Sequence, residues 1–388
     1  MILFVLGRQP EIGLAEIAAV YGRQPQLAGR QLATMDIDAV TALSAANRLG
    51  SVVKIAKVVQ NNFTISRDHL AQLCQSLFAE IEGKLTIGVS YYGPKVTKKS
   101  AIDLGRTIQT ILRNQHHSVR LIPSDQSTLG SATILHNGLA HNNPKKVELI
   151  FTSSLVAQTI YVQDINAYSF RDRRRPRRDA HNGMLPPKLA QTMINLAYGA
   201  KRQSADQPVN LLDPFCGTGV ILQEAALMGM NIYGTDLNSD MIANTKINLQ
   251  WLNRTHHIDC TPNLAIGDAT TFDWQSWAKP DVINLVATET YLGRPYTDTP
   301  SLTELKYNIT ACNVIVDKFL HNLSRQLPRG AGLCVGVPAW FIRDHIHHLP
   351  CIAQINKYGF TNRSIGANLI YHRPDQLVGR ELLVLQKR

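Results

Sequence analysis

The chain has 388 residues, of which 44% are hydrophobic and 18% charged, and it carries a formal net charge of +11 at pH 7. This length exceeds one ordinary hydrophobic core, so we expect two or three domains. Its apolar runs are shorter than the ~20 residues of a membrane span, and its six cysteines form no C-x-x-C pair, which argues against a zinc site or a disulfide framework. The basic character favours a polyanionic partner, and nucleic acid rather than an anionic membrane. We expect a cytoplasmic protein without a bound metal, and the sequence indicates no protein partner.

Residues 1–62 alternate strand and helix patterns. The apolar periodicity predicts a strand over 2–6, helices over 12–21 and 40–49, and a strand over 51–59. This arrangement predicts a small α/β unit of ferredoxin-like size, and no catalytic constellation appears in it.

The apolar pattern of residues 63–165 predicts a second unit with helices over 95–112 and 129–139. Its predicted strands cover 85–92, 119–122, and 147–151 continuing to 159–162. Three basic residues open the first of these helices, namely Lys95, Lys98 and Lys99. They form either a solvated helix end or a set of contacts to phosphates, which would position an RNA without reading its sequence.

A basic linker is predicted over residues 166–185, where Pro176 interrupts any continuous helix. Its arginines are solvated, bridge two domains, or contact phosphates, and we favour the phosphate contacts. The candidate RNA-binding residues here are Arg173, Arg174, Arg175, Arg177 and Arg178.

A strand–turn–helix–strand pattern follows. Leu211 and Leu212 end a buried strand, Gly217 and Gly219 form a turn that a Cβ would obstruct, and a helix over 220–228 leads to a short strand that ends in Asp236. Doubly wound folds bind an adenosine cofactor with this arrangement, and a carboxylate at that place can accept hydrogen bonds from both ribose hydroxyls. A dinucleotide fingerprint would need a third glycine, where this chain has Leu222.

The string Asp213-Pro-Phe-Cys-Gly-Thr-Gly219 resembles motif I of class I S-adenosylmethionine-dependent methyltransferases. The helix that starts at Pro186-Pro187 and this motif together resemble the THUMP-containing tRNA guanine-N2-methyltransferases, the archaeal and eukaryotic enzymes that modify guanosine at position 10. Residues 63–165 resemble the THUMP domain, an RNA-binding module, preceded by its ferredoxin-like companion.

This resemblance implies an α/β protein whose residues 186–388 form a class I, Rossmann-like methyltransferase domain, with N-terminal α+β ferredoxin-like and THUMP domains. It implies S-adenosylmethionine as cofactor and tRNA or another structured RNA as partner. It also implies that Asp268 accepts a hydrogen bond from the amino group of the adenine. The implied cofactor-binding residues are Asp213, Phe215, Cys216, Gly217, Gly219, Asp236, Leu237, Asp268 and Ala269.

The sequence departs from the family pattern after the strand predicted over 280–287. The family carries Asp/Asn-Pro-Pro-Tyr there, because an exocyclic amine is a poor nucleophile and needs hydrogen-bond acceptors that localise its lone pair, together with proximity and a stacked ring. This chain has Thr288-Glu-Thr-Tyr291. One alignment makes Thr288 the acceptor and Tyr291 the stacking ring, with Glu289 as an alternative acceptor. The other, aligned on Gly293, makes Glu289 the acceptor and leaves Leu292 where the aromatic ring belongs, and we prefer the first.

Arg294, a little further along the same loop, could reach a phosphate. Towards the end of the chain, a helix over 305–323, a strand over 333–337 and an antiparallel pair over 369–371 and 382–385 complete the predicted sheet. The leading hypothesis is an enzyme that methylates guanine N2 in tRNA. The alternative is an RNA-binding protein with a degenerate methyltransferase-like domain, and methylation of DNA or protein is disfavoured by the THUMP-like half.

Overall fold

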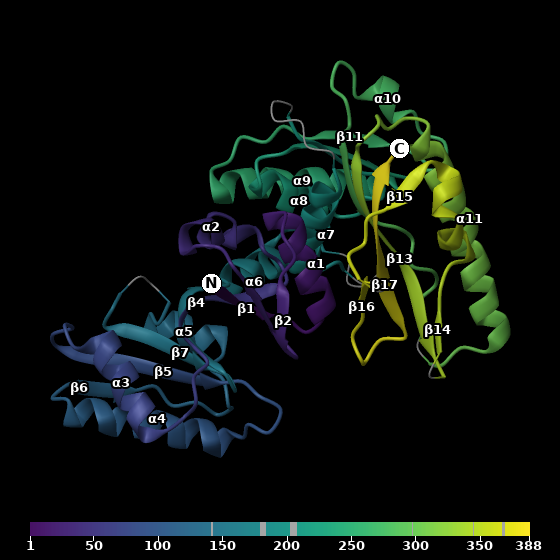
Figure 1. Ribbon diagram of the computed structural model, residues 1–388. Helices are drawn as coiled ribbons and strands as arrows, with labels where there is room; N and C mark the ends of the chain where they lie inside the picture. The colour runs from purple at the N-terminus through teal and green to yellow at the C-terminus, as the bar shows by residue number, and fades with distance from the viewer. Residues whose placement is uncertain (141–142, 179–183, 202–207, 297, 344, 367–368) are drawn as a thin grey trace. The chain divides into compact units, whose positions relative to one another are not determined.

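The structure, a computed structural model, describes residues 1–140, 143–178, 184–201, 208–296, 298–343, 345–366 and 369–388. Its backbone contacts divide the chain into two units (Figure 1). The N-terminal unit comprises Met1–Pro10, Gln24–Asn47 and Val52–Ala167. The C-terminal unit comprises Glu11–Arg23, Arg48–Ser51 and Tyr168–Arg388.

The N-terminal unit is built on one sheet with the strand order β2-β3-β1-β4-β8-β7-β5-β6. Strands β5 and β6 and strands β5 and β7 pair in parallel, and the other neighbours are antiparallel. Its elements are β1 Ile2–Leu6, β2 Gln26–Gly29, β3 Leu32–Met35, α2 Ala39–Ser44, η1 Ala46–Arg48, β4 Val52–Asn61, α3 Arg67–Phe78, β5 Lys84–Tyr91, α4 Lys98–Asn114, β6 Ser118–Leu121, α5 Ser131–Asn137, β7 Lys146–Phe151 and β8 Leu155–Val162.

Helix α4 is amphipathic and packs with α3 on this sheet. It starts at a capping box, in which Thr97 and Ser100 satisfy each other's backbone N–H groups. Its apolar face buries Leu104, Ile108 and Leu112 against the sheet. The boundary predicted after residue 62 does not separate two sheets. Strand β4 lies before it and β8 after it, and the two strands pair in one continuous sheet.

The C-terminal unit contains the remaining elements. They are α1 Pro10–Tyr21, α6 Ile165–Arg174, α7 Pro187–Ala200, β9 Asn210–Asp213, α8 Val220–Leu227, β10 Asn231–Asp236, α9 Ser239–His256, β11 Asn263–Ile266, α10 Trp274–Trp277, β12 Leu285–Glu289, α11 Leu302–Ser324, β13 Gly332–Ile342, β14 His345–His347, η2 Pro350–Tyr358, β15 Phe360–Asn362, β16 Leu369–Tyr371 and β17 Val378–Lys387.

The sheet of the C-terminal unit has the strand order β11-β10-β9-β12-β13-β17-β15. The first five strands are parallel to one another, β17 is antiparallel to β13, and β15 is antiparallel to β17. Strands β10 and β11 are added in order on one side of β9, and β12 then pairs with the other side of β9. Such a reversal leaves a crevice at the carboxyl ends of the two strands, where open α/β sheets bind ligands.

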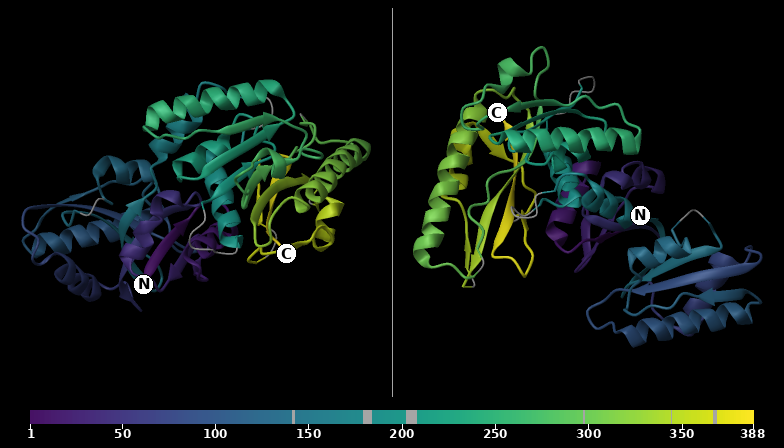
Figure 2. Two further views of the ribbon diagram at one scale, coloured as in Figure 1. Left: turned by 90° about the horizontal axis from the view of Figure 1, so that it is seen from above. Right: turned by 180° about the vertical axis from the view of Figure 1, so that it is seen from behind.

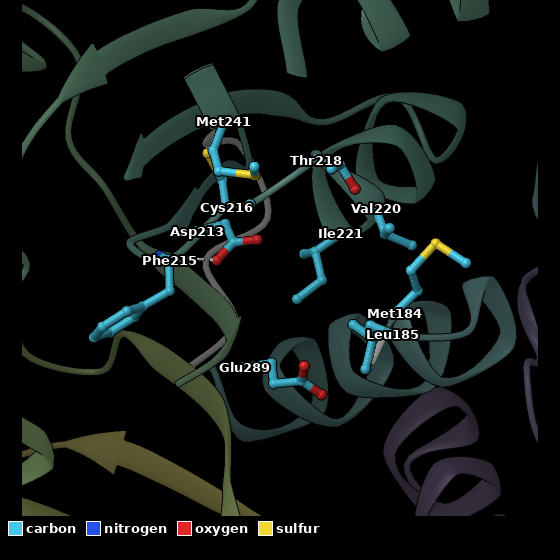
Figure 3. A pocket seen from close by; sticks show the side chains of 11 residues that line it. Met184, Leu185, Asp213, Phe215, Cys216, Thr218, Val220, Ile221, Met241 and Glu289 are labelled. Atoms are coloured by element: carbon cyan, nitrogen blue, oxygen red, sulfur yellow. Dashed lines mark hydrogen bonds between the residues drawn. The ribbon is translucent and has the colours of Figure 1, made fainter. Parts of the chain in front are cut away.

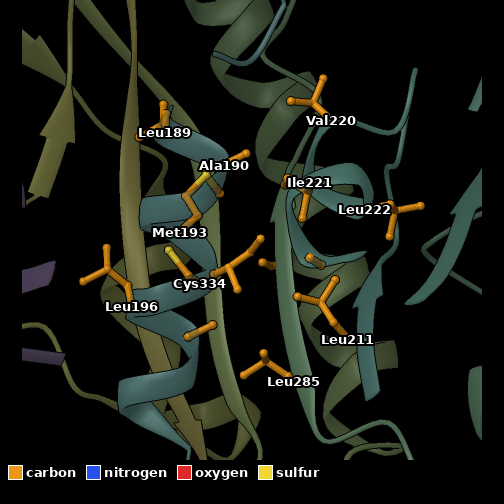
Figure 4. Close-up of a cluster of buried hydrophobic side chains, with 14 of the residues drawn as sticks. Leu189, Ala190, Met193, Leu196, Leu211, Val220, Ile221, Leu222, Leu285 and Cys334 are labelled. Carbon is orange, nitrogen blue, oxygen red and sulfur yellow. The ribbon is translucent and has the colours of Figure 1, made fainter. Parts of the chain in front are cut away.

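Successive residues of each strand face opposite sides of this sheet, so two apolar cores form. Leu211, Leu285 and Cys334 pack with α1, α7 and α8 on one face (Figure 4). Their chain neighbours Leu212, Val286 and Leu333 pack with α11 and η2 on the other. Figure 2 shows the sheet of this unit with helices on both faces.

Helix α1 belongs to the C-terminal unit although it lies near the start of the chain, and Glu16 fixes it there. The buried Glu16 carboxylate accepts hydrogen bonds from the N–H of Gly50 at 2.9 Å, the N–H of Ser51 at 2.8 Å and Nδ2 of Asn195 at 2.7 Å. The hydroxyl of Ser51 donates to it as well. Asn195 lies on α7, so this carboxylate joins α1 and residues 48–51 to the helix that covers the sheet.

Most predicted elements are confirmed, including the strand over 2–6, the helix over 12–21, and the antiparallel pairing of β16 with β17. The helix predicted over 40–49 is wrong in extent, because α2 ends at Ser44 and a 3-10 turn follows. The segment predicted to continue as one strand from 147 to 162 is two antiparallel strands, β7 and β8.

The strand predicted over 280–287 is shifted towards its carboxyl end, since β12 covers Leu285–Glu289. Part of the predicted linker 166–185 is helical, because α6 continues to Arg174, and residues 179–183 lie outside the described residues. Within the described ranges, none of the helices has the length and apolar composition needed to cross a bilayer.

Replacing Glu16 by alanine should destabilise the C-terminal unit by about 3 kcal/mol or more, because several buried donors would lose their acceptor. Urea unfolding followed by tryptophan fluorescence measures this, since the four tryptophans of the chain all lie in this unit. Glu11→Ala on the exposed side of α1 is the matched control and should leave the unfolding midpoint nearly unchanged. Equal midpoints for the two variants would contradict the role given to Glu16.

Candidate functional site

A glycine turn leads from β9 into α8. Gly217 and Gly219 have φ of +50° and +80°, in the left-handed region that favours glycine. A Cβ on Gly219 would lie 2.7 Å from Cγ2 of Thr245 on α9, whereas a Cβ on Gly217 would meet nothing within 4 Å. Gly219 is therefore required by packing and backbone conformation, whereas Gly217 leaves its backbone exposed to an open space.

Side chains from β10 and α9 fix this turn in place. Asp236, the last residue of β10, accepts hydrogen bonds from the N–H groups of Gly217 and Asn238, both at 2.9 Å. Thr245 Oγ1 donates to the carbonyl of Gly217 at 2.7 Å, and Asn248 Nδ2 donates to that of Thr218 at 2.8 Å. The turn thus has a defined shape without a bound ligand.

A pocket with a volume of about 140 Å³ opens beside the turn (Figure 3). The carboxylates of Asp213 and Glu289 enter it from the ends of β9 and β12, and most of the other lining side chains are apolar. The residues that line it are Met184, Leu185, Asp213, Phe215, Cys216, Gly217, Thr218, Val220, Ile221, Met241 and Glu289.

Asp213 is buried, and its environment disfavours the ionised form. Burial raises the pKa of its carboxyl to about 7, and the nearby carboxylates of Asp236 and Glu289 add to this rise. The hydroxyl of Thr288 donates to Asp213 Oδ1 at 2.6 Å, and this hydrogen bond lowers the pKa. Asp213 can therefore change charge near neutral pH.

Glu289 has a cationic partner. Nε of Arg380 on β17 donates to Glu289 Oε1 at 2.6 Å, and the Arg380 side chain is 7% exposed. Burial raises the pKa of Glu289, and the Arg380 guanidinium opposes this rise. The two pocket carboxylates thus have different electrostatic surroundings.

The structure distinguishes the two alignments of Thr288-Glu-Thr-Tyr291. Thr288 is fully buried, with its hydroxyl on Asp213, and is not among the pocket-lining residues. Glu289 lines the pocket, which favours the second alignment over the one that we preferred from the sequence. The reason is that β12 continues through Glu289, so alternate residues face opposite ways. Tyr291 is 44% exposed two residues beyond.

Of the predicted cofactor residues, Asp213, Phe215, Cys216 and Gly217 line the pocket, and Gly219 shapes the turn. The Phe215 ring turns away to pack edge-to-face on Phe319 of α11.

The other predicted cofactor residues lie at the ends of β10 and β11. Asp236 is the last residue of β10 and Leu237 follows it, and Leu237 is 73% exposed. Asp268 accepts hydrogen bonds from the N–H and hydroxyl of Thr270, and Ala269 is buried. Ile266, the last residue of β11 and 58% exposed, was not predicted. It pairs with Asp236 in the sheet. An apolar residue at the end of a strand was the sequence signal that could have indicated it.

The predicted RNA-binding residues divide by exposure. Arg173, Arg174, Arg177, Arg178 and Arg294 are exposed, as are Lys95, Lys98 and Lys99 in the N-terminal unit.

Arg175 differs from the other linker arginines because it is 3% exposed. One of its nitrogens contacts Met184 Sδ at 3.0 Å. The buried Arg171 forms a bidentate pair with Glu224 on α8, at 2.7 and 3.1 Å. Both residues anchor the segment instead of presenting charge to solvent, and we exclude Arg175 from the candidate RNA-binding residues.

Arg294 and Tyr307 lie close together beyond the pocket. The Arg294 guanidinium lies 5.1 Å from the centroid of the Tyr307 ring. Tyr291 is near both groups, since they each influence its pKa, which burial raises. Aromatic rings beside a guanidinium are suited to stacking on nucleobases.

The sheet order, the glycine turn and the carboxylate at the end of β10 define a class I, Rossmann-like methyltransferase fold. Residues 174–266 match the family model described as RMKL-like, methyltransferase domain, so this part of the chain is similar to that domain.

Curated relatives match part of the chain. The tRNA (guanine(10)-N2)-dimethyltransferase of Pyrococcus abyssi is 34% identical over 112 residues, which are 29% of this chain and 30% of that protein. The probable tRNA (guanine(10)-N2)-dimethyltransferase of Methanothermococcus thermolithotrophicus is 39% identical over 85 residues, or 22% of this chain and 49% of that protein. The chain thus spans less than half the length of these relatives.

Solved structures match the whole chain at low identity. TrmN from Thermus thermophilus has a TM-score of 0.52 and 16% identity, over 100% of this chain and 99% of that one. A predicted N6-adenine-specific DNA methylase from Listeria monocytogenes has a TM-score of 0.50 and 12% identity, over 100% and 96%. These similarities concern the fold, and they confirm the predicted fold class of the methyltransferase half.

Replacing Thr288 by valine should raise the pKa of Asp213 above 7. The hydroxyl stabilises the ionised carboxylate, and its loss should shift the titration by roughly half a pH unit or more. Carbon-13 NMR of labelled aspartate carboxyls measures this shift. Thr290→Val is the matched control, because the Thr290 hydroxyl donates to the Gly336 carbonyl instead. The same shift in both variants would contradict the assignment.

Proposed function

We propose that this protein is an S-adenosylmethionine-dependent methyltransferase that methylates N2 of a guanosine in tRNA. One observation carries the proposal: the glycine turn and the carboxylates of Asp213 and Glu289 all line one pocket at the reversal of the sheet. A cofactor turn and a hydrogen-bond acceptor for a target base therefore lie within reach of each other.

The residues at this crevice fit S-adenosylmethionine. Asp236 donates no hydrogen bonds, and its two oxygens retain lone pairs for ribose hydroxyls beyond the N–H groups they already accept. Leu237 and Ile266 offer exposed apolar surface at neighbouring strand ends, where an adenine ring would cover them. Gly217 leaves room for close approach along its backbone. The cofactor, when bound, supplies an electrophilic methyl group on a cationic sulfonium.

Asp213 is suited to hold the positive charge of this cofactor. Because burial raises its pKa to about 7, a cation bound beside it would favour the ionised form and lower that pKa. Cofactor affinity should therefore decrease as pH falls below about 7, where the free carboxyl becomes neutral.

Glu289 is suited to bind guanine. A carboxylate only accepts hydrogen bonds, and guanine presents two neighbouring donors, N1–H and the N2 amine, on its Watson–Crick edge. Adenine presents a donor beside an acceptor there and fits less well. Accepting a hydrogen bond from N2 would also localise the nitrogen lone pair toward the methyl group, and Tyr291 would stack on the base.

The relatives named as tRNA (guanine(10)-N2)-dimethyltransferases support tRNA as the substrate and N2 as the target. We propose that residues 63–165 form a THUMP domain, that 1–62 form its ferredoxin-like companion, and that 166–185 link them to a methyltransferase domain over 186–388. Helix α1 and residues 48–51 pack with that domain. An enzyme of tRNA modification with these parts would act in the cytoplasm.

Incubating the purified protein with unmodified tRNA and labelled S-adenosylmethionine, followed by nucleoside mass spectrometry, tests the function. We expect N2-methylated guanosine. Asp236→Ala should abolish cofactor binding in calorimetry, whereas Asp240→Ala, an exposed carboxylate on α9, should not.

Tyr291→Ala should lower kcat/KM by about 10- to 100-fold through lost stacking, and Tyr291→Phe should retain activity. Methylation of another base would contradict the target. Binding of cofactor and tRNA without transfer would favour the degenerate, RNA-binding alternative.

The exposed arginines of the linker should contact RNA phosphates. Replacing Arg173, Arg174, Arg177 and Arg178 by glutamate should weaken tRNA binding and flatten its dependence on salt, by roughly 0.7 to 0.9 in log–log slope for each lost phosphate contact. Fluorescence anisotropy across a salt series measures this. As a control, the same change is made at the exposed residues Lys279, Arg325, Arg329 and Lys357. Equal losses in both variants would indicate a nonspecific effect of net charge.

A further inference from the structure

Arg380 forms an ion pair with Glu289, one of the residues that line the pocket, and nothing in the motif patterns of the sequence indicates it. We propose that Arg380 is a positioning residue, which keeps Glu289 ionised and oriented so that it accepts hydrogen bonds from the target amine. This inference rests on the proposed function, since it assigns Glu289 to the substrate base. Arg380 would act through Glu289 without touching the base.

The sheet geometry lets the two side chains meet. Glu289 pairs with Gly336 of β13, and Arg380 of β17 pairs with Pro338, two residues further along the same strand. Residues two apart on a strand face the same side, so Glu289, Gly336, Pro338 and Arg380 share one face. Gly336 has no side chain, and a Cβ there would lie 3.3 Å from Cε of Met193. Arg380 can therefore reach diagonally across β13 to the end of β12.

The pair is short and largely removed from solvent. Nε of Arg380 donates to Oε1 of Glu289 at 2.6 Å, with side-chain exposures of 7% and 17%. The planar guanidinium fixes the direction of the carboxylate plane, because its donors have a rigid geometry. In the usual target-amine motif, two prolines stiffen the turn after the acceptor. Here Thr290 and Tyr291 occupy the positions of those two prolines. A side-chain partner can therefore supply the orientation instead.

The charges around Glu289 make a cation necessary. Asp213 on β9 shares the pocket, and Asp236 on β10 lies near Asp213, so both contribute negative charge. Burial also raises the pKa of Glu289, and Arg380 on β17 is the group that opposes it. Without Arg380, the pKa of Glu289 would rise further, and a larger share of its carboxyl would be protonated at a given pH. A protonated carboxyl offers one donor and loses acceptor capacity, so it would no longer suit two N–H groups of guanine.

The test compares the wild type with Arg380→Met, Arg380→Lys and the control Arg329→Met, an exposed arginine at the opposite end of β13. The dependence of kcat on pH is measured at saturating cofactor and tRNA, so that the effect of Asp213 on cofactor affinity does not enter. In Arg380→Met, the acid limb should move up by about one pH unit or more, which is a loss of about tenfold on that limb. Arg380→Lys should lie between the two, and the control should match the wild type.

A readout independent of activity separates this inference from the proposed function. Carbon-13 NMR of labelled glutamate carboxyls gives the pKa of Glu289 directly, with Glu289→Gln identifying its resonance. We expect this pKa to rise in Arg380→Met. A wild type that methylates no guanosine would refute the proposed function, whereas an unchanged pKa of Glu289 in Arg380→Met would refute the role of Arg380.

Arg380→Met leaves a buried carboxylate without its partner, so it can fail to fold. The double variant Glu289→Gln with Arg380→Met removes both charges and keeps an amide acceptor, which is a milder change than removing one member of a buried pair. We expect this double variant to retain some transfer activity and to lose the acid limb that Glu289 produces. An acid limb at the wild-type pH in the double variant would overturn the proposal.

Discussion

The pairing of β12 with β9 is the constraint on which the site depends. Leu285 and Val286 lie beside Leu211 and Leu212, so two strands that are separated by about seventy residues of sequence end at the same edge. Each strand then delivers one carboxylate, Asp213 or Glu289, into the same pocket. The hydrogen bond from Thr288 to Asp213 joins the two strand ends, so the distance between the carboxylates is set by the sheet and not by a flexible loop.

The two carboxylates face the same apolar surroundings, but their partners differ. Asp213 has a neutral hydroxyl as its main partner, and its pKa of about 7 leaves it ready to respond to a cationic ligand. Glu289 has a guanidinium partner, which lowers its pKa and so opposes the rise that burial causes. In the proposed function, these two identical chemical groups have different roles, one toward the cofactor and one toward the base, because environment determines the proton affinity of each.

The sequence predicted the parts of the site that depend on local backbone chemistry. Glycines at a turn after a strand and an aspartate at the end of the next strand are local signals, and both predicted the cofactor crevice. The register of Thr288 and Glu289 could not be read in this way, because it depends on where β12 ends. Arg380 lies 91 residues from Glu289 in the sequence. It is brought to Glu289 by β17, an antiparallel strand that lies two places from β12 in the sheet.

The arginine run and the domain boundary also depend on tertiary packing, which local sequence patterns do not reveal. Arg175 is similar to its neighbours in sequence but is buried beside Met184, and only the packing of the segment separates it from the exposed arginines. Helix α1 was correctly predicted as a helix. Its membership in the C-terminal unit depends on Asn195 and the backbone of Gly50, which no local pattern indicates.

Helix α1 also has a consequence for synthesis on the ribosome. Glu16 is synthesised 179 residues before its partner Asn195. N-terminal segments generally fold first during translation, yet Ile12 and Ala15 of α1 pack in one core with residues of α7, β9 and α8, which are synthesised later. These two side chains therefore cannot join that core until α7 and α8 have been made. We expect the catalytic half to be completed in one late step, when α7 and the sheet become available to the first helix of the protein.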